Sequence, residues 1–417
     1  MNIRKRFCSA ALASCLVLAI PMQSMAALSD YDGETAARLQ DNKMEFDELQ
    51  NLIKEYNPSI INARNELISA ENDKNAVVGG FQSDIEDLKS TLIDLKDQRK
   101  ELKSSAKENH AENSPEYQFA LAQLNAAIAQ IEGGYDDKGN KVSGALDQLS
   151  KGSNSYRKNV DKGLEKGEKA MDTPIRQMTQ ATEGLMITYN SMIDTQATLN
   201  KSIELYEVLL ESTKRQVSLG LGTETDILSA ESDLMGMRSS ADKVDQAVIQ
   251  LRSQLCSLTG WAADANPEIG GIPAADVSKI AAMDLSSDTV KAINNNQTLM
   301  GTRHASSGKT TAGVKNKALN VNEQEQKLTI EMQRLYNEVQ AKKLAYDAGT
   351  AAFEKAKIAK NGADVQYRSG IISRVQYLAT ELQYVQAEGT WKAADNGLFQ
   401  AILNYEWAVD GFAAIPD

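Results

Sequence analysis

Cysteine is almost missing from this chain, and most of what there is lies at the N-terminus. Cys8 and Cys15 fall within the first 26 residues, and Cys256 stands alone in the rest of the sequence. A single cysteine allows neither an internal disulfide nor a cluster of thiolates around a metal ion. The stability of the chain beyond residue 26 must therefore come from packing.

Histidine and proline are also rare, with two histidines and seven prolines in 417 residues. His110 and His304 lie in different halves of the chain, and neither stands at ligand spacing from another candidate ligand. No nucleophile or acid–base constellation appears either, so the sequence predicts no catalytic residue, no metal site, no cofactor and no enzyme. Few prolines and many Ala, Glu, Gln, Lys and Leu residues favour helix.

A long apolar run occurs once, from Phe7 to Ile20. A basic start precedes the run, Pro21 ends it, and Ser24-Met25-Ala26 offers small residues for cleavage. This order is typical of a secretory signal over residues 1–26, with cleavage before Ala27. Retention as an uncleaved anchor and lipidation at Cys15 are the alternatives. The sequence therefore predicts an exported protein of the cell envelope.

Positive charge is scarce in the exported part. The signal takes three of the 45 basic residues and no acidic one, which leaves 42 against 57 and a formal charge of −15. Binding to a phosphate backbone depends on clustered positive charge, so nucleic acid is not an expected partner.

What the chain does have is a heptad pattern. Apolar or small residues recur from Ile227 to Leu258 in alternating steps of three and four, which is typical of a coiled coil. A similar stripe runs from Ile175 to Leu210, and Asp172-Thr173-Pro174 is expected to open that helix. The two stripes are separated by a glycine-containing break, so they predict an antiparallel helical hairpin.

The C-terminal part repeats this plan. Seven alanines from Ala341 to Ala363 step by four and three, and we expect them to let a partner helix approach closely. The two breaks align without a gap, since Gly370, Leu378 and Glu381 each follow Gly220, Leu228 and Glu231 by 150 residues. An internal repeat with one insertion in its first half is the simplest interpretation.

The predicted fold class is all-α, with two repeated long antiparallel helical hairpins and a helical insert. Residues 27–42 are expected to be weakly structured. The predicted segments are 1–26 (signal), 27–42 (N-terminal segment), 43–79 with 174–261 (first repeat), 80–173 (charged helical insert), 262–287 (linker) and 288–417 (second repeat).

The order of these features resembles the TolC-type outer-membrane efflux proteins. The features are an Asn57-Pro58 helix start, the Leu219–Thr223 break, Asp226-Ile227-Leu228-Ser229-Ala230-Glu231 after it, and Leu258-Thr259-Gly260. Most of this order recurs with Ser369–Ser373 and Tyr377–Glu381. The β-hairpins of that family are not predicted, because the charged insert and the short polar Ala305–Ala312 segment occupy their places. Gln297 and Gln376 also replace the family's Pro and tip Asp.

The resemblance implies a protomer of an α-barrel, assembled as a homo-oligomer that is a trimer in the family. It also implies an efflux or secretion channel component of the outer membrane. Its hairpin tips would dock to an adaptor of the membrane-fusion type, which links to an inner-membrane transporter. The partner-binding residues are then Leu219, Gly220, Leu221, Gly222, Thr223, Ser369, Gly370, Ile371, Ile372 and Ser373.

Charged residues flank both tips, with Glu224 and Asp226 at the first and Arg368 and Arg374 at the second. Opposite charges on alternating tips could hold an aperture closed, and ordinary solvated faces are the alternative. For the whole chain, the alternative to an export component is a structural coiled-coil spacer of the cell envelope.

Overall fold

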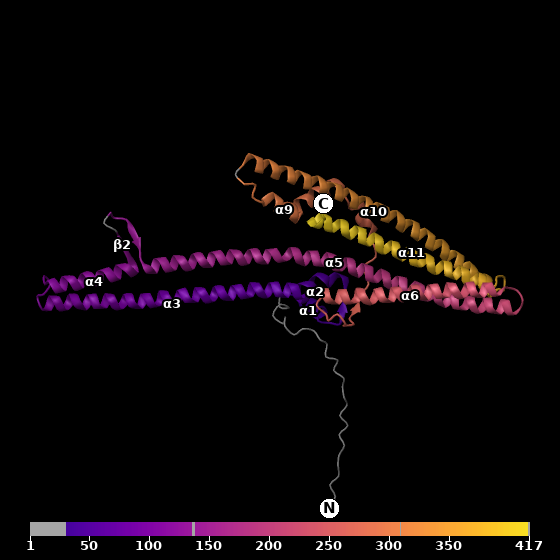
Figure 1. Cartoon of the computed structure of the whole chain (residues 1–417), viewed down its shortest axis with the longest axis horizontal. Helices are drawn as coiled ribbons and strands as arrows, with labels where there is room; N and C mark the ends of the chain where they lie inside the picture. The colour runs from indigo at the N-terminus through magenta and orange to yellow at the C-terminus, as the bar shows by residue number, and fades with distance from the viewer. Residues whose placement is uncertain (1–30, 136–137, 309, 416–417) are drawn as a thin grey trace, which may run out of the picture. The chain divides into compact units, whose positions relative to one another are not determined.

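The computed structural model describes residues 31–135, 138–308 and 310–415 (Figure 1). The predicted signal, with Cys15, lies outside these residues. The chain divides into two compact units. The main unit contains the described residues up to Pro58 and from Ile175 onward, and the 59–174 unit contains those between them.

The described chain is mostly helical, and its few strands are short. The helical elements are α1 (Gly33–Arg38), the 3-10 turn η2 (Phe46–Glu48), α2 (Leu49–Tyr56), α3 (Pro58–Glu108), α4 (Pro115–Glu132), α5 (Ala145–Ser218), α6 (Glu224–Leu258), α7 (Val277–Ala282), α8 (Leu285–Asn295), α9 (Gln297–His304), α10 (Thr311–Arg368), α11 (Arg374–Trp407) and the π-helical turn η3 (Ala408–Phe412). The strands are β1 (Lys43–Met44), β2 (Gly133–Tyr135), β3 (Lys141–Ser143) and β4 (Glu268–Ile269).

The first long hairpin of the main unit consists of α5 from Ile175 onward and α6 (Figure 1). Leu210 of α5 packs against Ala230 and Leu234 of α6, and further along α6 Val248 is buried. The predicted start of the α5 segment at Asp172-Thr173-Pro174 is wrong, because α5 runs unbroken from Ala145 with Pro174 inside it. A proline removes one backbone donor from a helix, and the other backbone hydrogen bonds of the 74-residue helix keep this segment helical.

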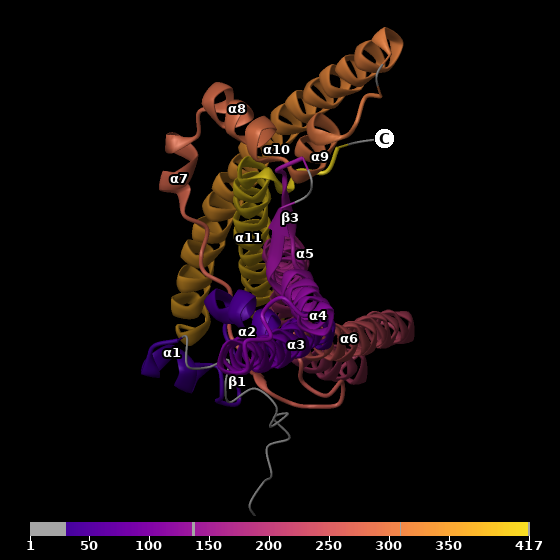
Figure 2. The same cartoon turned by 90° about the vertical axis from the view of Figure 1, so that its left-hand side faces the viewer.

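The second hairpin consists of α10 and α11, joined by a short break (Figure 1). Its core includes Met332, Val339 and Leu398, and α8 contributes Ala292 beside them. Figure 2 shows α8 and α9 beside the N-terminal part of α10. The prediction that the alanine series faces the partner helix is wrong for most of its members. Ala363 is buried and Ala356 is half-buried, while the exposed members are Ala341, Ala345, Ala348, Ala352 and Ala359.

The N-terminal segment packs on the first hairpin. Asp32 caps α1, Leu39 is buried, and β1 pairs in parallel with β4 in the segment after α6. The expectation of weak structure over residues 27–42 is therefore wrong from residue 31 onward, and residues 27–30 lie outside the described part. Burial of Leu39 and Met44 in the core around Met186 and Leu255 orders the segment.

Each half of the main unit has the same asparagine contact at the end opposite its hairpin tip. The Asn57 side chain donates to the Leu258 carbonyl at 2.8 Å, and Asn296 donates to the Gly411 carbonyl at 3.2 Å. Gly260 and Gly411 have φ angles of 83° and 97°, a left-handed conformation that favours glycine. A Cβ on either glycine would lie within 2.3 Å of a carbonyl oxygen next to the asparagine, so only glycine fits.

The 59–174 unit contains α3, α4 and the first part of α5, with β2 and β3 paired as a small antiparallel hairpin. Its apolar core lies around Leu92, Ile128 and Ile131. Towards Pro58, α3 and α5 meet through half-buried residues, among them Phe81 and Tyr156, whose ring centroids are 6.5 Å apart. The segment boundaries predicted from the sequence remain predictions.

Candidate docking site at the hairpin tips

The first tip is a tight reversal between α5 and α6. The Leu221 N–H donates to the Gln216 carbonyl at 2.8 Å, and the Gly220 N–H donates to the Val217 carbonyl at 2.9 Å. With Gly220 at a φ of 75°, this is a Schellman motif, which satisfies the last carbonyls of a helix. Thr223 then caps α6.

The second tip has the same geometry 150 residues further on. The Ile371 N–H donates to the Gln366 carbonyl at 2.8 Å, and the Gly370 N–H donates to the Tyr367 carbonyl at 3.0 Å. Gly370 has a φ of 70°, and Ser373 caps α11. The two breaks, which the sequence aligned, therefore make the same backbone hydrogen bonds at equivalent residues.

Both tips also close with a capping box. The Thr223 N–H and hydroxyl donate to the Asp226 carboxylate at 2.7 and 2.8 Å. In the second tip the Ser373 N–H donates to the Gln376 side-chain oxygen at 2.9 Å. An amide oxygen accepts this hydrogen bond as a carboxylate does, so Gln376 can replace an Asp at this position without loss of the cap.

The apolar side chains of the tips face solvent. Leu221 is 74% exposed and Ile371 is 72% exposed, and they occupy the same place in the two motifs. A Schellman motif often carries an apolar residue here, which contacts a side chain in the last turn of the helix. The last-turn residues that accept these hydrogen bonds are Gln216 and Gln366, so the apolar contact that usually covers such a residue is not made there.

The flanking charges differ in what they do. Hydrogen bonds from the Thr223 backbone and side chain lower the pKa of Asp226, which keeps this carboxylate ionised as a cap. Among the described residues, Glu224, Arg368 and Arg374 form no ion pair, although the Arg368 Nε–H donates to the Asp364 carbonyl at 3.2 Å. The sequence predicted Asp226 as an aperture charge. In the structure its carboxylate accepts hydrogen bonds from Thr223 and caps α6.

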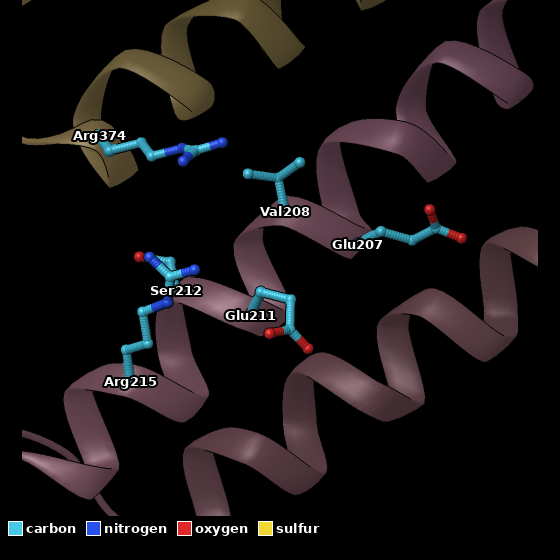
Figure 3. Close-up of a pocket in the computed structure, with 6 residues that line it drawn as sticks. All are labelled: Glu207, Val208, Glu211, Ser212, Arg215 and Arg374. Carbon is cyan, nitrogen blue, oxygen red and sulfur yellow. The ribbon is translucent and has the colours of Figure 1, made fainter.

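A hollow of about 280 Å³ lies beside the second tip, between α5 and the first turn of α11 (Figure 3). The lining residues are Glu207, Val208, Glu211, Ser212, Arg215 and Arg374. Figure 3 shows the Arg374 side chain extending toward α5, while Glu207 points away from it and pairs with Arg238 of α6 at 2.7 Å. Glu207, Glu211 and Arg215 were not among the site residues predicted from the sequence. Their spacing of four residues was the signal that they share one face of α5.

The outer helices α6 and α10 carry a second apolar face. On α6, Leu228, Met235 and Ile249 are exposed at multiples of seven residues, away from the seam that contains Val248. On α10, the exposed apolar residues at such intervals are Ile330, Leu344, Ile358 and Val365. The exposed alanines lie next to this row on α10. By contrast, Leu205 of α5 packs against α11, so α5 has helix neighbours on two sides.

Comparisons with known proteins found likeness in fold. The outer membrane protein VceC of Vibrio cholerae matches with a TM-score of 0.42 and 12% identity, over 62% of this chain and 76% of that one. CusC, which was described in a study of transmembrane channel formation, matches with a TM-score of 0.45 and 11% identity, over 82% and 96%. The Campylobacter jejuni CmeC outer membrane channel matches with a TM-score of 0.41 and 14% identity, over 61% and 68%.

These similarities to TolC-family channels concern the course of the backbone alone. No protein-family model matches the chain, and no curated protein matches it. Within the described residues, no helix combines the length and apolar character needed to cross a bilayer. Nor does the described part bring three His, Cys, Asp or Glu side chains together as metal ligands.

Proposed function

We propose that this protein is a passive export component of the cell envelope that binds an adaptor protein through its two hairpin tips. The observation that supports this function is the pair of exposed apolar side chains, Leu221 and Ile371, at equivalent places in two geometrically matched tips. A helix reversal requires glycine at Gly220 and Gly370, but it does not require an exposed leucine or isoleucine.

The partner that fits these tips is a helical hairpin with apolar pockets between its helices. Buried apolar anchors in such pockets supply much of the binding free energy at interfaces. Adaptors of the membrane-fusion type present a hairpin of this kind, so an adaptor coupled to an inner-membrane transporter is the partner we infer. The protein itself would perform no chemistry.

The proposal includes assembly of several copies. The exposed rows on α6 and α10 leave apolar area on two outer faces of the main unit. Asp242 and Asn337 interrupt the two rows, and the apolar residues that remain exposed at regular intervals are typical of a helix that contacts a partner. Contact between α6 of one copy and α10 of the next would bury both rows and produce a ring of helices, which is a trimer in the family that the sequence resembles.

The test is capture of a membrane-fusion-type adaptor from the same organism. The double variant Leu221→Asp with Ile371→Asp should lose capture by at least about tenfold, because charged groups cannot enter apolar pockets. Its helix content and melting temperature should stay near those of the unchanged protein, since both side chains face solvent. The matched control is Glu224→Gln with Arg374→Gln, which changes the flanking charges and leaves both apolar anchors in place.

Undiminished capture by a folded double variant would refute tip docking and favour the structural spacer. Loss of folding in the double variant would show that the tips are packed structure, which also contradicts the proposal.

A further inference from the structure

The α5 segment of the 59–174 unit carries a row of lysines on the side away from α3. The row comprises Lys151, Lys158, Lys162, Lys166 and Lys169, all exposed. Lys151 and Lys169 pair with carboxylates one turn away in the same helix. Among the described residues, Lys158, Lys162 and Lys166 have no ion-pair partner. This part of an acidic protein therefore presents an uncompensated positive edge.

The α3 helix of the same unit carries a row of the opposite sign. Glu66, Asp73, Asp87 and Asp94 are exposed at intervals of seven or fourteen residues, and Gly80 occupies the remaining place of the series. None of these four carboxylates forms an ion pair within the described part of the chain. Each precedes by one position a partly covered residue of α3, which faces α5 or, for Asp94, packs on α4, so the row follows one side of α3.

Small residues lie between this acidic row and the outermost edge of α3. Ser69, Ala76, Ser83 and Ser90 recur every seven residues, and all are exposed. Small side chains let a neighbouring helix approach closely, and the long stems of lysines can cover them while the ammonium groups reach the acids. The α3 edge is therefore complementary to the α5 edge in both shape and charge.

The charged residues of the two edges also lie at matching positions along the helix axes, which we call their height. Lys74 donates to Asp161 at 2.9 Å across the seam, and Phe81 lies against Tyr156. Because α3 and α5 run in opposite directions, Asp73 is level with Lys162. Lys166 is then level with the interval between Glu66 and Asp73.

We propose that the 59–174 units of neighbouring copies pack side by side, with the lysine edge of α5 against the acidic edge of α3 in a second copy. A rotation about an axis parallel to the two helices moves one edge onto the other without a change in height, so Lys162 meets Asp73. Because the two edges differ, the contact is heterologous, and repeating it by rotation closes a ring. The inference rests on the assembly of copies within the proposed function.

The first experiment is a disulfide between two chains of the full exported protein. Asp73→Cys and Lys162→Cys variants, mixed and oxidised, should give a covalent dimer that neither variant gives alone. Native Cys256 is buried and does not compete. The matched control is Asn75→Cys mixed with Lys162→Cys, since Asn75 is exposed near the same height on the other side of α3. A dimer of equal yield in the control would overturn the inference.

The second experiment reverses charges. Lys162→Glu with Lys166→Glu should weaken self-association by about tenfold, because like charges then face each other. Glu66→Lys with Asp73→Lys should weaken it similarly, and a chain with all four changes should regain most of the lost affinity. Sedimentation at low and high salt measures each dissociation constant. Failure of the four-fold variant to regain affinity contradicts the inference, as does a chain that stays monomeric.

Adaptor capture on the same variants separates the two proposals. Capture without the disulfide between the Asp73→Cys and Lys162→Cys chains would sink the side-by-side contact and leave tip docking in place. Formation of that disulfide without adaptor capture would contradict tip docking and leave the side-by-side contact in place.

Discussion

Val248 and Gln250 lie on the same helix two residues apart, but only Val248 belongs to the seam of α6. Val248 is 8% exposed, and Gln250 is fully on the solvent side. Val248→Asp should lower the free energy of unfolding by about 3 kcal/mol or more, since it buries an unpaired charge. Gln250→Asp should change it by less than about 0.5 kcal/mol. Urea unfolding followed by circular dichroism measures both, and equal effects would contradict the seam.

Glu183 is a residue whose environment makes folding depend on pH. Burial raises the pKa of Glu183 above its ordinary value of 4.5, and Glu406 raises it further. A hydrogen bond from the Trp407 indole at 2.6 Å opposes this shift without cancelling it. A carboxyl group with a raised pKa is favoured in its protonated form by the folded state.

The sign of the pH effect follows from proton linkage. The stabilisation from Glu183 is complete below its unfolded pKa, and it is lost as the pH rises from 4.5 through the folded pKa. Glu183→Gln keeps an oxygen for the Trp407 indole and removes the titration. Melting curves between about pH 4 and pH 8 should show that the melting temperature of the variant rises relative to that of the unchanged protein as pH rises. A gain in the opposite direction would contradict the assignment of burial as the cause.

At the scale of elements, glycine has opposite effects in a tip and inside a helix. Gly220 adopts a left-handed conformation in open space, whereas Gly236 lies within α6 with no atom near its missing Cβ. Gly220→Ala should destabilise the first hairpin by about 1 kcal/mol through backbone strain. Gly236→Ala should stabilise it by about 0.5–1 kcal/mol through helix propensity. Thermal melts of the two variants check the signs, and the same sign for both would refute the tip geometry.

The apolar faces of α10 belong to the scale of the whole molecule. Leu344 is exposed and lies nearly half a turn away from the seam with α11. If this face contacts another copy, Leu344→Asp should raise the dissociation constant of self-association by about tenfold or more. Thr329→Asp is the matched control, because Thr329 is exposed and lies about a quarter of a turn from both the buried Leu328 and the exposed Ile330.

Analytical ultracentrifugation of both variants measures the effect. An unchanged dissociation constant for Leu344→Asp would show that the apolar row of α10 does not mediate assembly.

The sequence alone determined the two hairpins and the equivalence of their tips. Heptad periodicity is local, and a positive-φ reversal requires glycine, so Gly220 and Gly370 could be aligned without a structure. The exposed apolar residues Leu221 and Ile371 followed from their places in the two breaks.

Tertiary structure decided which face of a helix is covered. The alanine series and the Met332–Val339 stripe of α10 both have heptad spacing, and periodicity does not say which one meets α11. Side-chain size does not decide it either, since Leu344 and Ile358 stay exposed while Ala363 is buried. The packing of α11 and α8 on α10 determines which residues lose contact with water.

Tertiary structure also decided two other outcomes. Local cap signals predicted a helix start at Pro174, but the long helix α5 continues through it. Glu211 and Arg215 line a hollow only because α11 brings Arg374 beside them.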